Sequence, residues 1–246
     1  MSGHSKWANI KRQKQAADLK RGNLFSKLSR AITVAVLEGG KITDPEHNVK
    51  LRLAIEKAKA ANMPKENIQR AIERGVGKGT EALKEVIIEA FGPSGVAFLV
   101  LAATDNINRT ISQIRQVLDR GGGKLGSSGS VRYQFNRCGL ATFSRSKVKE
   151  EAVLDFSEKI GAFDIDSDDN FFYVYFPFEN LGRVKEAMAK EAVYDSVEID
   201  FKPNSLIKID DKETATKILA LVDQLEELDD VQKVFANFEI KDDFLK

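Results

Sequence analysis

Residues 139–176, GLATFSRSKVKEEAVLDFSEKIGAFDIDSDDNFFYVYF, decide the fold of the body of this chain. GLATFS and FFYVYF are rich in β-branched and aromatic residues and predict strands, whereas KVKEEAVLDFSEKIGA has the three- and four-residue apolar spacing of a helix. The acidic turn SDDN joins FDID to FFYVYF. A further helix over 179–192 and a strand over 196–201 complete the order βαββαβ, which is the split βαβ of ferredoxin-like folds.

The segments on either side of this unit predict a second α+β domain. Residues 85–103 form a predicted hairpin around the turn GPSG, and a helix over 108–123 and a strand over 130–135 follow. One helix leaves part of the apolar sheet face uncovered, and the C-terminal helix (212–228) and strand (231–238) supply the missing cover. We therefore expect a discontinuous domain. The alternative, in which the last helix and strand pack on the βαββαβ unit, stays open but overloads a unit that is already complete.

The first part of the chain has the pattern of a small helical domain. Apolar residues recur at helical spacing between Leu24 and Val36, and a second helix is predicted to begin at Asp44, whose carboxylate can cap it, with Pro45 in its first turn. Pro64 opens a third helix, for which Gly75 is the expected left-handed terminator. The predicted fold class is a multi-domain α+β protein, with a small helical N-terminal domain and two ferredoxin-like α+β sandwiches, one inserted in the other. The predicted domains are residues 1–78, residues 79–137 with 206–246, and the inserted residues 138–205.

Composition describes an ordinary globular protein with an uneven charge distribution. The 246 residues are 42% hydrophobic and 30% charged, no apolar run approaches the ~18 residues of a membrane span, and Cys138 is the only cysteine. The charged N-terminus lacks the apolar core of a secretory signal, so we expect a cytoplasmic protein with no membrane partner. Residues 1–78 carry 17 Lys and Arg against 7 Asp and Glu, whereas the rest has a net charge of −9. This asymmetry favours a basic section that meets a polyanion.

The residues that usually carry catalysis are scarce. The two histidines, His4 and His47, have no acid partner or ligand set in the sequence, which argues against nucleophilic catalysis and against a zinc site. Residues 75–80, GVGKGT, lack the first Gly and the following Ser or Thr of a phosphate loop, and they come after a helix rather than a strand. We therefore expect no enzyme activity, no metal and no cofactor.

Residues 1–30 hold eight Lys and Arg against one acid, Asp18, and are called the basic head here. Together with the helices that follow, the basic head is the candidate nucleic-acid-binding site. Lys and Arg side chains neutralise phosphates without reading sequence, an indole can stack on an unpaired base, and Asn can contact a base edge. The opposing interpretation is that Trp7 docks on the helical core and the lysines only solubilise it. The Gly-rich segment 121–130 is equally a connector or a mobile contact loop, with Arg109 and Lys124 as its candidate contacts. The predicted nucleic-acid-binding residues are Lys6, Trp7, Asn9, Lys11, Arg12, Lys14, Lys20, Arg21, Lys27, Arg30, Arg52, Lys57 and Lys59.

Several motifs give the chain a family resemblance. They are MSGHSKWANIK (1–11), KRGNLFSKL (20–28), NVKLRLAIEKAKAANMPKENIQRAI (48–72), NRT (108–110) and the Gly-rich stretch before GSVRYQF. Together they resemble the YebC/PmpR family over essentially the whole length. The resemblance implies three domains, one helical and two α+β, and a non-enzymatic regulator. Members of this family have been described as DNA-binding transcriptional regulators, and others, including the mitochondrial translational activator of cytochrome c oxidase, as acting on ribosomes or messenger RNA.

Charge and resemblance together predict a nucleic-acid-binding regulator. Our first hypothesis is a DNA-binding transcriptional regulatory protein. The alternative is a ribosome- or ribosomal-RNA-associated translation factor or translational activator, whose partner is ribosomal or messenger RNA. A third hypothesis is a protein-interaction scaffold that binds a protein partner through the acidic body.

Overall fold

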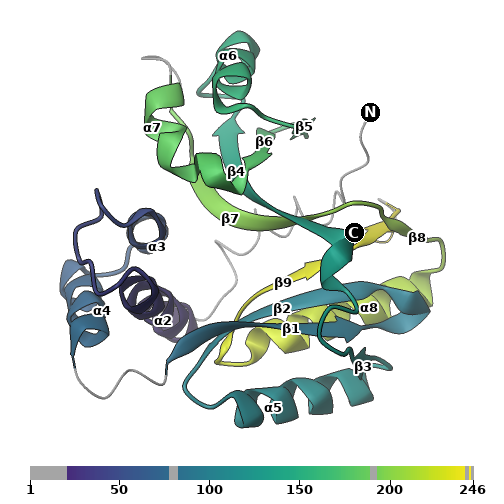
Figure 1. Cartoon of the computed structure of the whole chain (residues 1–246). Coiled ribbons are helices and arrows are strands. Elements are labelled where there is room, and N and C mark those ends of the chain that lie inside the picture. Colours follow the sequence, from purple (N-terminus) through teal and green to yellow (C-terminus); the bar gives the residue numbers. More distant parts are fainter. Residues whose placement is uncertain (1–20, 78–82, 189–192, 242–243, 245–246) are drawn as a thin grey trace. The chain divides into compact units, whose positions relative to one another are not determined.

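The computed structural model describes residues 21–77, 83–188, 193–241 and 244. The chain divides into two compact units. One is continuous, Phe135–Lys202, and is called the inserted unit here; the other contains the described residues before and after it and is called the main unit. Figure 1 labels most of the helices and strands of both. None of the helices in the described ranges combines the length and the apolarity that crossing a bilayer requires.

The main unit begins with three helices, α2 (Arg21–Glu38), α3 (Val49–Ala60) and α4 (Lys65–Val76). Their shared core contains Ile32, Val36, Leu51 and Ile68. Asn48 caps α3: its Oδ1 accepts from Leu51 N at 3.0 Å, and its Nδ2 donates to the Ala35 carbonyl of α2 at 2.9 Å. One buried amide thus ends a loop, begins a helix and ties that helix to its neighbour.

Two of the predicted helix ends were wrong. The helix expected from Asp44 begins at Val49, because Asn48 supplies the cap; the Asp44 carboxylate instead accepts from Glu46 N and contacts His47 Nδ1 at 2.8 Å. Gly75 does not terminate α4 but lies inside it. A Cβ on Gly75 would stand 2.6 Å from the Val36 Cβ, so this glycine is needed for the close approach of α2 and α4.

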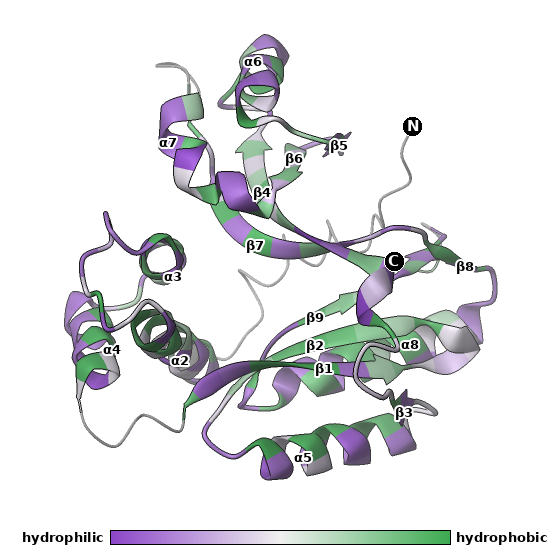
Figure 2. Cartoon of the chain, viewed as in Figure 1, coloured by the Kyte–Doolittle hydropathy of each residue, from purple (hydrophilic) through white to green (hydrophobic). Residues whose placement is uncertain are grey.

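The α+β part of the main unit is an antiparallel sheet in the order β3-β1-β2-β9. Helices α5 and α8 pack their apolar stripes on the same hydrophobic core as the sheet, with Phe98, Val100, Ile114, Leu118 and Leu221 among its members. Figure 2 shows β2 as an almost continuous hydrophobic ribbon, as expected for a central strand. Strands β8 and β10 form a separate parallel pair. The bounds are β1 Lys84–Phe91, η1 Pro93–Gly95, β2 Ala97–Thr104, α5 Ile107–Arg120, β3 Lys124–Leu125, η2 Arg132–Gln134, β8 Ile207–Ile209, α8 Lys212–Glu227, β9 Val231–Ala236 and β10 Phe238–Ile240.

The expected strand over 130–135 does not form. The third strand beside β1 is the two-residue β3, and residues 132–134 form the short 3₁₀ turn η2. Phe135 instead opens the first strand of the inserted unit. The reason is a carboxylate, Glu89, which binds the backbone N–H groups of this segment and is described below.

The inserted unit has the strand order β5-β6-β4-β7, which is the order of a ferredoxin-like sheet and confirms the α+β fold class. Phe143, Phe156 and Phe176 form its core, with edge-to-face ring centroids 5.1 and 6.3 Å apart. The regular helix expected over 179–192 is not seen in the described part of this range, which ends at residue 188. A 3₁₀ turn, η3, and a single helical turn, α7, take its place. The bounds are β4 Phe135–Ser144, α6 Glu150–Ile160, β5 Asp164–Ser167, β6 Phe171–Pro177, η3 Phe178–Arg183, α7 Val184–Ala187 and β7 Ser196–Pro203.

Candidate nucleic-acid interface

Part of the predicted interface lies outside the described residues. This holds for Lys6, Trp7, Asn9, Lys11, Arg12, Lys14 and Lys20, and for the side chain of Arg21. Their assignment stays a prediction from sequence.

The described helices carry a set of exposed cations. Residues 21–77 hold eleven Lys and Arg against six Asp and Glu. Lys57 and Lys59 occupy the last turn of α3, where positive charge also interacts favourably with the helix dipole. Arg70 and Arg74 lie four residues apart on α4, so they share one face of that helix. All four side chains are exposed, and with the exposed Lys65 they are called the α3–α4 cations here.

Two of the predicted contact residues are buried in the main unit, and a third forms an ion pair there. Lys27 is 7% exposed, and its ammonium donates to the Glu226 carbonyl at the end of α8. Arg52 is 8% exposed. Arg30 forms an ion pair with Asp230 and also donates to the Asp229 carbonyl at 2.7 Å. In the described conformation Lys27 and Arg30 bind other elements of the main unit, and the assignment of all three residues as nucleic-acid contacts stays a prediction.

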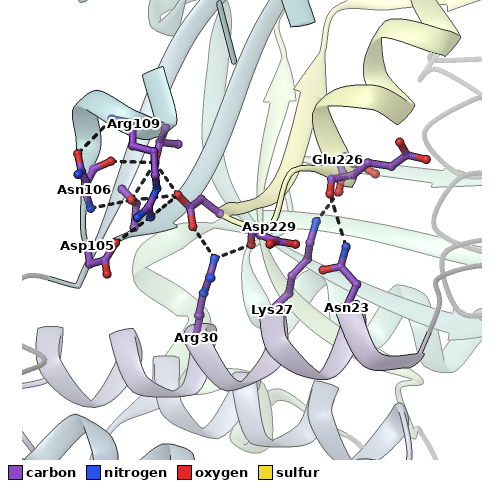
Figure 3. A network of polar contacts seen from close by, with 12 residues as sticks. Asn23, Lys27, Arg30, Asp105, Asn106, Arg109, Glu226 and Asp229 are labelled. Atoms are coloured by element: carbon purple, nitrogen blue, oxygen red, sulfur yellow. Dashed lines mark hydrogen bonds and ion pairs between the residues drawn. The ribbon is translucent and has the colours of Figure 1, made fainter. Parts of the chain in front are cut away.

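Asp230 joins a network of polar contacts that includes Arg30 and Arg109, both labelled in Figure 3, and its side chain is 5% exposed. Oδ1 accepts from Arg30 Nη1 of α2 at 2.5 Å. Oδ2 accepts from Arg109 Nη2 at 2.9 Å and from Thr110 Oγ1 at 2.7 Å, both in the first turn of α5. Thr104 Oγ1, at the end of β2, donates to the same oxygen at 3.2 Å. One carboxylate therefore joins the helical part of the main unit to its sheet and to α5.

The NRT motif reaches Asp230 because of the way α5 begins. The Asn106 side chain caps α5 by accepting from Arg109 N at 3.1 Å, which places Arg109 and Thr110 in the first turn. Burial by itself raises the pKa of Asp230, but the hydrogen bonds from Arg109 and Thr110 and the positive charges of Arg30 and Arg109 outweigh burial and lower it. Hydrogen bonds to Asp230 and Asp105 raise the pKa of Arg109. The network is therefore held in its ionised form.

A pocket of about 290 Å³ lies beside this network. Its charged lining consists of Arg30 and Arg109 with the carboxylates of Asp105, Asp229 and Asp230, so the carboxylates outnumber the guanidinium groups. Such a lining does not attract a phosphate, and Arg109 already pairs with Asp105 at 2.8 Å and with Asp230. Arg109 was a candidate contact residue from sequence; in this structure its guanidinium is a link between elements.

The Gly-rich segment is held by a second buried carboxylate. Glu89 of β1 is 8% exposed and accepts from the backbone N–H groups of Gly129 and Val131 at 2.6 Å and of Arg132 at 2.9 Å. Burial raises the pKa of Glu89, and these three hydrogen bonds outweigh burial and lower it. These three N–H groups are thus bound within the protein and are not free to bind a phosphate. Lys124, the other candidate contact, is exposed on β3, with its ammonium 6.0 Å from the Phe91 ring centroid.

The described residues contain no group of three or more His, Cys, Asp and Glu side chains that could hold a metal ion. Cys138 is buried, and His47 is an exposed partner of Asp44.

Comparison with known proteins identifies the family. Residues 5–78 match the TACO1/YebC protein N-terminal domain, and residues 83–238 match the TACO1/YebC second and third domain. The chain belongs to the TACO1/YebC family. The resemblance seen in the sequence motifs is confirmed.

Relatives of this TACO1/YebC chain share its full length. Proteins from Aquifex aeolicus and Rubrobacter xylanophilus, each named a probable transcriptional regulatory protein, are 48% and 46% identical to it over 100% of the chain and 99% and 98% of their own lengths. A crystal structure of a conserved hypothetical protein from Aquifex aeolicus is similar to it with a TM-score of 0.84 at 46% identity, covering 93% of this chain and 94% of that one. The relatives are thus named as regulators.

Sequence reasoning did not identify Asp230 and Glu89. Asp230 contacts Arg30 across 200 positions, and nothing local in ELDDV distinguishes it from the exposed Asp229 beside it. Glu89 carries a weak signal, because a charged residue inside the apolar strand EVIIEAF needs a partner.

Proposed function

We propose that this TACO1/YebC chain is a non-enzymatic, cytoplasmic, nucleic-acid-binding regulator, and that it acts on transcription by binding DNA. The observation that carries the proposal is the separation of charge, with a net charge of +10 on residues 1–78 and −9 on the rest. The names of its relatives as probable transcriptional regulatory proteins support the regulatory role. The acidic body repels a polyanion and therefore orients it toward the helical domain, leaving the body for a protein partner.

The binding mechanism is the release of counterions. Each Lys or Arg that neutralises a phosphate displaces a condensed cation, and the gain in entropy favours the complex. The α3–α4 cations provide this charge on helices α3 and α4, and the eight Lys and Arg of residues 1–30 add to it. Arg can in addition bind a phosphate through two parallel hydrogen bonds.

A charge-reversal pair tests the proposal. Lys59→Glu with Arg70→Glu should weaken binding to duplex DNA by at least about tenfold and reduce the salt slope by about two, since each removed phosphate contact lowers it by about one. Lys208→Glu with Lys212→Glu is the matched control, because it makes the same change in net charge at two exposed lysines in the acidic part of the main unit. Equal loss of affinity in both variants would show that general charge, rather than this surface, governs binding.

The second candidate function is a translation factor that binds ribosomal RNA. This function would use the same cations. One further observation favours it: Tyr133 is 72% exposed and follows the exposed Arg132. Proteins that recognise single-stranded RNA use exposed aromatic rings to stack on unpaired bases. Competition between duplex DNA and purified ribosomes at physiological salt separates the two functions. Preferential binding to ribosomes would support translation and argue against the DNA-binding proposal.

A further inference from the structure

The acidic body contains one segment with the opposite charge. Residues 120–149 hold seven Lys and Arg and not one Asp or Glu, although residues 79–246 as a whole hold 21 basic and 30 acidic side chains. The first part of this segment, residues 121–134, belongs to the main unit and is called the Gly-rich loop here. Lys124, Arg132 and Tyr133 are its exposed charged and aromatic side chains. The loop itself therefore carries two positive side chains, Lys124 and Arg132, and no acidic one.

The backbone of the Gly-rich loop is held by hydrogen bonds from both sides. Glu89 binds three of its N–H groups, and Gly126 N donates to the Glu89 carbonyl at 2.8 Å. On the other side, Asn204 Nδ2 donates to the Tyr133 carbonyl at 3.0 Å, and Asn204 N donates to the Gln134 carbonyl at 2.8 Å. The peptide groups around Tyr133 are thus hydrogen-bonded on both sides. A ligand that binds the ring does not have to order the loop first, so little entropy is lost.

The exposure of Tyr133 is unusual for so rigid a site. Its side chain is 72% exposed, whereas the other exposed large hydrophobic residues in the described part of the main unit, Ile42 and Val76, are 43% and 44% exposed and belong to the helical part. The apolar residues nearest to Tyr133 in the sequence, Val131 and Phe135, are 0% and 7% exposed, so they do not join the ring in an exposed apolar patch. A protein interface of ordinary size would bring several apolar anchors together. An aromatic ring next to cations instead fits a base with its phosphates.

We propose that the Gly-rich loop is a second nucleic-acid contact, in which Tyr133 stacks on an unpaired base while Arg132 and Lys124 neutralise flanking phosphates. This inference rests on the proposed nucleic-acid binding and names the feature that is recognised, a single-stranded stretch. Stacking on the ring is tolerant of sequence, because every base has a π face. The buried Glu89 keeps the loop in the shape that presents the ring.

The test compares three full-length proteins on two probes, a labelled single-stranded oligoadenylate and a duplex of mixed sequence. Tyr133→Ala should weaken oligoadenylate binding by at least about fivefold, the lower end of the effect of removing a stacked aromatic ring. Tyr133→Phe keeps the ring and should stay within about twofold of the wild type. Duplex binding should be unchanged in both variants, because a paired base cannot reach the ring.

The outcomes separate this inference from the proposed function. Unchanged oligoadenylate binding by Tyr133→Ala, with duplex binding intact, would overturn the loop contact and leave the proposed function standing. Absence of binding to either probe by the wild type would overturn both. A photo-crosslinking amino acid placed at position 133 in cells should label nucleic acid, and labelling of protein alone would show that the loop is a protein-binding site.

Discussion

Replacing Asp230 by Ala is expected to destabilise the main unit and to loosen the helical part from the sheet. The substitution removes an acceptor that receives hydrogen bonds from Arg30, Arg109, Thr104 and Thr110. The hydroxyls of Thr104 and Thr110 lose less hydrogen-bonding energy than the two guanidinium groups do. Thr110 Oγ1 still has hydrogen-bond partners in Thr104 Oγ1 at 2.8 Å and the Asn106 carbonyl at 3.1 Å.

The magnitude follows from burial. Breaking a buried ion pair by removing one member costs about 3–5 kcal/mol. Here the side chains of Arg30 and Arg109 are 31% and 45% exposed, so water rehydrates part of what Asp230 releases, and we expect a loss of about 2–4 kcal/mol. Asp230→Asn should cost about 1–2 kcal/mol, because its amide oxygen still accepts from Thr110 while its amide nitrogen faces a guanidinium donor.

Hydrogen exchange as a function of urea measures this loss region by region, which suits a chain of several domains better than one global transition. Peptides from α2, α5 and β9 should exchange faster in Asp230→Ala. Asp229→Ala is the control: its side chain is exposed, and the backbone carbonyl that binds Arg30 remains, so its effect should stay within about 0.5 kcal/mol. A loss in Asp230→Ala no larger than in this control would refute the view that Asp230 joins the two parts.

The same network predicts a dependence on pH. The pKa of Asp230 is lowered in the folded protein below its ordinary value of 3.8, so its contribution is fully present above that value. As the pH falls through the folded pKa, the carboxylate takes up a proton and the contribution is lost. The stability difference between the wild type and Asp230→Asn should therefore be constant near neutrality and shrink below about pH 4. A difference that did not change on acidification would contradict the assignment.

Three further substitutions test other parts of the structure. Gly75→Ala should destabilise the helical part by about 1–3 kcal/mol in urea unfolding, since its Cβ would stand 2.6 Å from Val36, and a neutral effect would refute the close packing of α2 on α4. Asn48→Ala removes a cap and leaves the Ala35 carbonyl without its donor, and should cost about 1–3 kcal/mol by the same measurement. Glu89→Gln weakens the anchor of the Gly-rich loop, so amide exchange in residues 126–134 should rise at least about tenfold. Because the pKa of Glu89 is lowered in the fold, the wild-type loop should lose the same protection only as the pH falls below the ordinary Glu value of 4.5; equal protection in both proteins would contradict the anchor.

The α+β class could be predicted from sequence because it depends on local periodicity. The continuous run of aromatic and β-branched residues in FFYVYF predicts a buried strand, and the helical spacing in KVKEEAVLDFSEKI predicts which face of a helix is buried. Periodicity failed at residues 130–135, where the backbone N–H groups bind a distant side chain, Glu89, and so are not free to form a ladder. Periodicity also gave the wrong role for Gly75. A sequence does not distinguish a glycine that allows a neighbouring helix to pack closely from a glycine that ends a helix.

The candidate site was predictable only in its overall charge. Counting Lys and Arg identifies a basic domain, but it cannot tell which cations face water. In the sequence pattern of α2, Lys27 and Arg30 cannot be distinguished from lysines and arginines that face water. In the structure both bind groups about 200 residues away in the sequence. The exposed Tyr133 was missed for a related reason: SVRYQF alternates as a strand does, and only the structure shows that its backbone is held in a turn that exposes the ring.

The central claim, that positive charge gathered in the first domain exists to bind a nucleic acid, is tested most directly by a salt titration of binding by the full-length chain. Neutralisation of about five phosphates predicts a slope of log affinity against log salt of roughly −3.5 to −4.5. Replacing Lys11, Arg12 and Lys14 by Gln should reduce the size of that slope by about two to three. An affinity independent of salt, or an unchanged slope in the triple variant, would contradict the account.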